Sequence, residues 1–245
     1  MLKRFSTTIG LRQLYWVDLM SGKKIWALKT VAMILSIYYG FWIILGIVLG
    51  NFEISGASAL IENFIDAMII LLLLRAVERS YSITVSEMTI TFQLPWKNFS
   101  LGLLVGVTFW LGAGIISETL RPVLPLWTIV PKEYNFVTQY ANSQGLLKVA
   151  LFFAVGFITP VIEEVLYRGL IYSILRRGFF VPATLILSSG IFGLVHVYPE
   201  LVVISFLIGC GLAWLRERGK SLVCPIVAHT TINCFSLLFS GCYHG

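Results

Sequence analysis

The chain has 245 residues, of which 58% are hydrophobic and only 12% are charged. Together with a mean hydropathy of +0.87, this composition excludes a soluble globular domain, and the long apolar runs favour membrane helices over the alternating strands of a barrel. The net charge of +6 does not call for nucleic acid as a partner, because Lys and Arg gather at the ends of apolar runs, as membrane topology and contact with the lipid bilayer require.

The N-terminal part predicts an interfacial segment followed by three spans. Residues 1–24 are polar and basic, with apolar side chains at near-helical spacing, which is typical of a short interfacial helix. The spans are predicted at about 26–50, 60–77 and 101–116. Residues 1–145 carry no chemical motif, so we interpret them as a membrane scaffold.

Two features of this scaffold remain open in the sequence. Glu62 and Asp66 lie four residues apart near the start of the second span. We expect them at a solvated or headgroup-level end, with a position in a cavity wall as the alternative. Residues 82–93 alternate as extended chain does, and residues 117–145 form the longest predicted loop, either on the membrane surface or over a cavity. The glycines at 102, 106, 112 and 114 allow close helix approach.

Residues 146–245 are predicted to form the catalytic or binding half. Four further spans, joined by short connections, are expected at about 146–177, 180–197, 200–215 and 222–240. Basic connections alternate with connections that lack Lys and Arg, which predicts about seven spans in one multi-pass cell-membrane domain with a cytoplasmic N-terminus. The four cysteines show no CxxC spacing and are interpreted as packing residues.

The first unusual motif is Glu163-Glu164-x-x-x-Arg168, inside an apolar run. A charge at the bilayer centre costs about 2.5–3.5 kcal/mol on insertion scales, so ionisable residues there are paired or functional. Residues four apart share a helix face, so Glu164 is expected to pair with Arg168 while Glu163 points elsewhere. The alternative is a purely structural network of all three side chains.

Two histidines in later apolar segments are candidate partners of Glu163. If the fourth and fifth spans form a hairpin that turns at Phe179 and Phe180, then Glu163 and His196 lie at equal depth, roughly 20–25 Å from the turn. Counting residues in the same way along the last two spans, with turns near 219 and 199, places His229 about 12 Å short of the depth of His196 in the bundle. Helix tilt or a deeper start of the last span would be needed to bring His229 to the same level.

These side chains suit the activation of water. Glu163 would take a proton from the water, His196 would orient it, and His229 with Asn233, four residues apart on one face, would stabilise an oxyanion. The set Glu163, His196 and His229 also resembles an incomplete zinc site. The sequence therefore leaves both a zinc-dependent and a metal-free reaction open.

The motifs Glu163-Glu164-x-x-x-Arg168, Phe192-x-x-x-His196 and His229-x-x-x-Asn233 resemble the three motifs of the CPBP (CAAX protease and bacteriocin-processing, or Abi) family, and in particular type II CAAX prenyl endoproteases. The resemblance covers about residues 146–240. It implies an intramembrane endopeptidase, metallo or glutamate-dependent, that cleaves a membrane-associated peptide or protein. By matching positions, Glu163 would be the base, with Glu164 and Arg168 as its support. His196 would hold the water, and His229 and Asn233 would form the oxyanion pair.

Two other function classes remain as alternatives. A non-proteolytic immunity protein that binds a bacteriocin or its membrane target would have no need of an unpaired buried carboxylate. A transporter or proton relay would spread polar residues along a path across the membrane, whereas here they gather in one zone of the sequence.

Overall fold

The computed structural model describes residues 3–49, 56–81, 96–120, 136–196 and 199–239, and this part of the chain is helical apart from short connections, without a strand. The N-terminal helices are α1 (Lys3–Leu49), α2 (Gly56–Tyr81) and α3 (Trp96–Leu120). The prediction of an all-α membrane bundle is confirmed.

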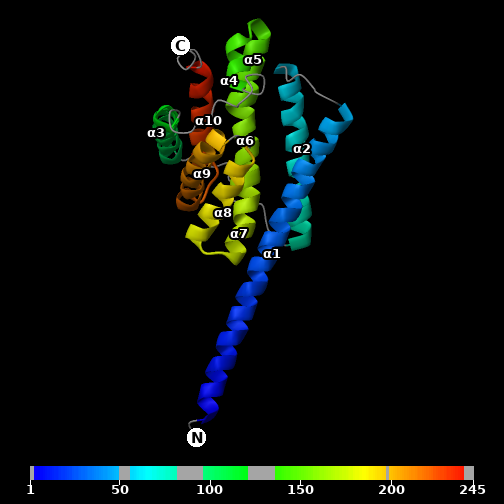
Figure 1. Cartoon of the computed structure of the whole chain (residues 1–245), viewed down its shortest axis with the longest axis vertical. Coiled ribbons are helices and arrows are strands. Elements are labelled where there is room, and N and C mark those ends of the chain that lie inside the picture. The colour runs from blue at the N-terminus through cyan, green and yellow to red at the C-terminus, as the bar shows by residue number, and fades with distance from the viewer. Residues whose placement is uncertain (1–2, 50–55, 82–95, 121–135, 197–198, 240–245) are drawn as a thin grey trace.

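A long helical stretch forms the centre of the bundle (Figure 1). It consists of α5 (Gly145–Phe153), the π-helical segment η3 (Ala154–Ile158), α6 (Thr159–Glu164), a second π-helical segment η4 (Val165–Ile171) and α7 (Tyr172–Gly178). The short α4 (Phe136–Asn142) precedes it, and α8 (Val181–Leu194), α9 (Pro199–Gly219) and α10 (Val223–Leu238) follow. In space, α2 packs on α5, α1 on α7, α8 on α9, and α10 on α3.

Each of the seven expected spans coincides over most of its length with a helix of the described residues. By length and composition, three helical stretches of the described residues suffice to cross a bilayer, namely Gly22–Val48, Trp96–Thr119 and Gly145–Gly178. Helices α8 and α10 are apolar but have 14 and 16 residues, or roughly 21–24 Å at 1.5 Å per residue, less than the ~30 Å of a hydrocarbon core. The number of helices that cross the bilayer therefore stays a prediction.

Two expectations about the N-terminal half are wrong. Residues 3–24 are not a separate interfacial helix, because α1 is continuous from Lys3 to Leu49. No proline interrupts this stretch, so nothing in the sequence stops the helix, and its N-terminal part projects beyond the other helices (Figure 1). The expected loop 117–145 contains the end of α3 and the whole of α4, whose Tyr140 is buried against Leu151 and Ala154. The extended structure expected at 82–93 lies outside the described residues.

The turn after α7 is confirmed. Phe179 and Phe180 are both extended, with ψ of 151° and 161°. Pro182 then occupies the first turn of α8, where its missing N–H costs no hydrogen bond.

Pro160 explains the first π-helical segment. Proline lacks the N–H that would bond to the carbonyl four residues earlier and clashes with that carbonyl, so the helix must widen or kink before it. The carbonyls of η3 instead accept bonds from side chains: Thr159 Oγ1 donates to Ala154 O at 3.0 Å, and from α10 Asn233 Nδ2 donates to Val155 O at 3.0 Å. The Cys234 thiol approaches Gly156 O at 3.6 Å. The interruption of the long helix therefore attaches α10 to it.

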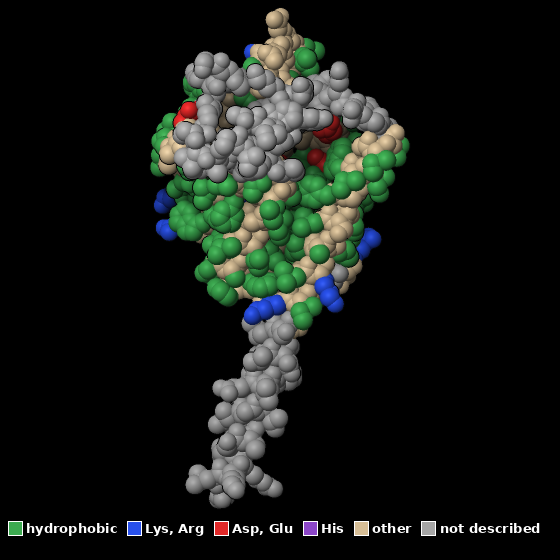
Figure 2. Space-filling view, in the orientation of Figure 1, with side chains coloured by type: hydrophobic (Ala, Val, Ile, Leu, Met, Phe, Trp, Pro, Cys, Tyr) green, Lys and Arg blue, Asp and Glu red, His purple; other side chains and the backbone are tan. Residues whose placement is uncertain are grey.

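The outer surface of the bundle is apolar. Large hydrophobic side chains on different helices are more than 60% exposed, among them Ile47, Leu72, Leu104 and Ile115, a pattern that suits contact with lipid. Figure 2 shows a broad hydrophobic surface, with most Lys and Arg side chains of this face toward its lower part and acidic side chains near the other end.

Glycines allow close contact between α3 and α10. A Cβ on Gly106 would lie 2.6 Å from both Ala228 O and Thr231 Cβ, and one on Gly102 would lie 2.7 Å from Cys224 O. A Cβ on Gly112 would meet nothing within 4 Å. The predicted close approach is therefore confirmed at 102 and 106 and wrong at 112.

We predict that Gly106→Ala destabilises the protein by about 1–3 kcal/mol, the usual cost of overpacking, because the new methyl group meets backbone on α10. Thermal unfolding of the purified variant in detergent would show a lowered Tm. Gly112→Ala on the same helix is the matched control and should keep or slightly raise the Tm, since alanine is the better helix former. Equal Tm values for the two variants would contradict this packing.

Candidate functional site

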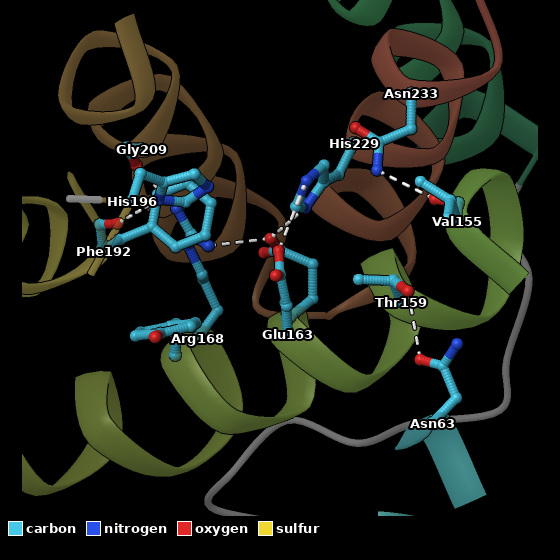
Figure 3. A network of polar contacts seen from close by, with 12 residues as sticks. Asn63, Val155, Thr159, Glu163, Arg168, Phe192, His196, Gly209, His229 and Asn233 are labelled. Carbon is cyan, nitrogen blue, oxygen red and sulfur yellow. Dashed lines mark hydrogen bonds and ion pairs between the residues drawn. The ribbon is translucent and has the colours of Figure 1, made fainter. Parts of the chain in front are cut away.

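The motif residues gather around one cavity of about 450 Å³. The long central stretch, α8 and α10 contribute one side of its wall, and α1 and α2 contribute the other. The lining residues are Tyr38, Tyr39, Trp42, Ala59, Glu62, Asn63, Asp66, Val155, Thr159, Glu163, Val195, His196, His229 and Asn233. Figure 3 shows how the motif side chains converge from separate helices.

Glu164 is fully buried and connects two helices beside the cavity. Its Oε1 accepts a hydrogen bond from Arg168 Nη1 at 2.7 Å and another from His229 Nδ1 at 2.8 Å. Arg168, only 1% exposed, also donates from Nη2 to Gly209 O on α9 at 3.3 Å, and its guanidinium lies 4.2 Å from the Phe192 ring centroid. The pairing of Glu164 with Arg168 that the spacing predicts is confirmed.

Glu163 points into the cavity and is 29% exposed. Its Oε2 lies 3.6 Å from His229 Nε2, and no Lys or Arg of the described residues pairs with it. His229 therefore stands between two glutamates: its Nδ1 is held by Glu164, and its Nε2 faces Glu163 (Figure 3).

His196 follows the C-terminal end of α8. Its Nδ1 lies 2.7 Å from Phe192 O, and because a carbonyl can only accept, Nδ1 carries the hydrogen. In the neutral ring, Nε2 then has a free lone pair. Phe192 packs edge-on against both imidazoles, at 4.9 Å from His196 and 5.8 Å from His229. Glu163 and His196 line the same cavity, as their equal depth predicts.

The expected depth of His229 is wrong. The residue count placed it well short of His196, whereas in the structure it bonds to Glu164 and lines the cavity with His196. The count treated all helices as parallel, but α3 and α9 appear strongly tilted in Figure 1, and a tilted helix rises less along the bundle. Asn233 also lines the cavity, with one amide N–H donated to Val155 O.

Sequence reasoning missed most of the opposite wall, although Glu62 and Asp66 had been noticed. They line the cavity, so the alternative reading of this pair is the right one. Asp66 Oδ1 accepts hydrogen bonds from Tyr38 at 2.7 Å and from Trp42 Nε1 at 2.8 Å. The four-residue spacing of two acids within an apolar run was the available signal.

Arg216, near the C-terminal end of α9, is buried and only 5% exposed. Its Nε donates to Arg168 O at 3.1 Å and its Nη2 to Ser173 Oγ at 2.9 Å. Arg216 therefore attaches the end of α9 to η4, the segment that carries Arg168.

The residues do not form a metal site as they stand. No group of three or more His, Cys, Asp or Glu side chains in the described part of the chain is arranged to hold a metal ion. The set Glu163, His196 and His229 is therefore not arranged as a zinc site in this part of the chain, and a metal-dependent reaction stays a prediction.

Comparisons with known proteins agree with the motifs. Residues 145–235 match the family model "Type II CAAX prenyl endopeptidase Rce1-like". The chain is 25% identical over 194 residues to "Putative membrane peptidase YdiL" of Bacillus subtilis (strain 168), an alignment that covers 75% of this chain and 71% of the relative. No solved structure matches the chain significantly. The resemblance to type II CAAX prenyl endopeptidases is confirmed for residues 145–235. A bacteriocin-related function and a metal-dependent reaction, which the resemblance also implies, stay predictions.

We predict that Arg168→Ala lowers stability by about 3–5 kcal/mol, because it leaves the fully buried Glu164 carboxylate without its cation. Melting curves of purified variants in detergent would show this as a lowered Tm or a loss of folded yield. Glu164→Gln combined with Arg168→Met should recover part of the loss, since no unpaired charge remains. An unchanged Tm for Arg168→Ala would contradict a stabilising role for the pair.

Proposed function

We propose that the protein is an intramembrane endopeptidase that hydrolyses a peptide bond of a membrane-associated protein or peptide, with a water molecule activated by Glu163 and His196. The observation that carries this proposal is the convergence of Glu163, His196, His229 and Asn233 on one cavity inside an apolar bundle. A carboxylate beside two imidazoles is chemistry for proton transfer.

The tautomer of His196 favours this role. With Nδ1–H bonded to Phe192 O, Nε2 accepts a hydrogen bond from the water while the Glu163 carboxylate accepts the second one. Both hydrogens of the water are then directed, so an oxygen lone pair is left for the carbonyl carbon of the substrate. Glu163 takes the proton as the C–O bond forms, and it returns that proton to the leaving amine when the C–N bond breaks.

His229 and Asn233 are proposed to stabilise the charge that develops on the carbonyl oxygen. Nδ1–H of His229 is donated to Glu164, and Nε2 is directed toward Glu163 and the cavity. Nε2 can therefore donate to that carbonyl oxygen only when both ring nitrogens carry hydrogen. The Asn233 amide has a second N–H beyond the one that bonds to Val155 O. Donors that are already fixed by their own partners need no rearrangement during the reaction.

The comparisons support a membrane protease in general terms: the family model spans all six motif residues, and the relative carries a peptidase name. They leave the substrate, the CAAX type of cleavage and the use of a metal open. The polar side chains Glu62, Asn63 and Asp66 line the same cavity as the motif residues, and this gathering favours a reaction centre over the distributed path of a transporter.

We predict that Glu163→Gln and His196→Ala each reduce cleavage by about a hundredfold or more, the range expected for lost general-base catalysis. Membrane peptides that accumulate in a Glu163→Gln strain would supply the substrate, and the purified variants would then be assayed on it. Both variants should melt within a few degrees of the unchanged protein. Glu78→Gln, on the exposed face of α2, is the control that should keep full activity. Near-normal turnover by either cavity variant would remove that residue from the mechanism.

We also propose a cell-membrane location with the N-terminus in the cytoplasm. The middle of α1, where Lys23 lies, is close to the C-terminal ends of α7 and α9, which carry basic residues. A Cβ on Gly178 would lie 2.9 Å from Lys23 O, and Arg176 pairs with Glu217 at 3.6 Å. Basic residues at one end of a bundle mark its cytoplasmic side.

This topology predicts opposite accessibility for two connections. In a variant without the native cysteines, Arg177→Cys should react only with a membrane-permeant thiol reagent, while Asn51→Cys should also react with an impermeant one. Labelling of both positions from the same side of intact cells would contradict the orientation.

A further inference from the structure

The part of the cavity wall that α1 and α2 contribute carries carboxyl groups and aromatic rings. Glu62 and Asp66 contribute carboxylates from α2, while Tyr38, Tyr39 and Trp42 contribute rings from α1. Among the described residues that line the cavity, none is Lys or Arg. Two carboxylates four residues apart on one helix face repel one another. A bound cation would reduce this repulsion, and no described lining residue supplies one.

Asp66 is held in place by its neighbours. Tyr38 and Trp42 both donate to the same oxygen, Oδ1, which fixes the carboxylate between α1 and α2. The position of α2 is fixed in turn by Asn63, whose Oδ1 accepts a hydrogen bond from Thr159 at 3.0 Å. The carboxylate of Asp66 therefore has a defined position relative to the long helix that carries Glu163.

We propose that this wall binds a cationic group of the substrate, such as the side chain of Lys or Arg, and so selects substrates with a basic residue near the cleaved bond. Two independent features indicate a cation. Carboxylates form strong charge-assisted hydrogen bonds with ammonium and guanidinium groups, and the faces of Trp and Tyr rings attract the same groups. Because the cavity is shared with Glu163 and His196, a residue bound here lies in the chain that is to be cleaved.

The inference rests on the proposed function, but its test does not require cleavage. The probes are two lipopeptides, palmitoyl-Gly-Arg-Gly-amide and palmitoyl-Gly-citrulline-Gly-amide, which differ in charge and hardly in shape. The full chain is placed in nanodiscs of uncharged phosphatidylcholine, so that the bilayer does not attract the cation, and its Tm is followed against probe concentration. We expect the arginine probe to bind about tenfold or more tightly than the citrulline probe, as the loss of a charge-assisted contact predicts.

Variants locate the binding site. Asp66→Asn removes the charge but keeps an oxygen for Tyr38 and Trp42, and it should abolish the preference for arginine. Glu62→Gln should weaken that preference and serves as the second variant if Asp66→Asn folds poorly. Tyr38→Phe, which keeps the charge, should retain at least part of the preference, and Glu78→Gln should retain all of it.

Two outcomes would overturn the proposal: equal affinity of the unchanged protein for both probes, or a preference that survives in both Asp66→Asn and Glu62→Gln. A preference that depends on Asp66 in a protein without peptidase activity would uphold the cation site and reject the proposed function. Cleavage that is equally fast with arginine and with citrulline near the scissile bond would uphold the proposed peptidase function and reject the cation site.

Discussion

The buried carboxylate of Glu164 is the interaction on which the site depends. One of its oxygens accepts hydrogen bonds from Arg168 on the same helical stretch and from His229 on α10. Arg168 in turn reaches a carbonyl of α9, and Arg216 of α9 donates back to the Arg168 carbonyl. A charge in an apolar interior is tolerated only when it is paired, and both partners of Glu164 bond to the same oxygen, Oε1. Glu164 therefore requires the long helix, α9 and α10 to remain in register.

The interrupted helix is the second requirement. A regular helix uses its own carbonyls, but Pro160 forces a π-helical segment whose carbonyls need other donors. Asn233 and Cys234 supply two of them from α10, one turn beyond His229. The backbone irregularity and the buried carboxylate therefore fix α10 at two neighbouring points, and together they determine how far the His229 ring lies from Glu163.

The sequence predicted the helices and the Glu164–Arg168 pair, because both depend on local spacing along one helix. It also predicted that Glu163 and His196 lie close together, because the turn at Phe179 and Phe180 sets their depth. The sequence did not predict the position of a side chain where that position depends on the tilt and packing of separate helices. His229 was misplaced because residue counting assumes parallel helices. For Asp66, the sequence left a solvated end and a cavity wall open, since its partners Tyr38 and Trp42 lie on another helix. The contact of Arg216 with the Arg168 carbonyl likewise depends on how two helices pack.

The two halves of the chain differ in what constrains them physically. In the proposed reaction, base, water and oxyanion donors must lie within hydrogen-bond distance of the same few atoms, so residues 145–235, which match the family model, have little freedom in charge or shape. In the proposed complex, the wall of α1 and α2 binds the substrate away from the reacting bond. Its charge can differ without disturbing proton transfer, provided that Asn63 and Thr159 still hold α2 against the long helix. A division of this kind assigns the reaction to the C-terminal helices and the choice of substrate to the N-terminal ones, in a cavity that neither half encloses alone.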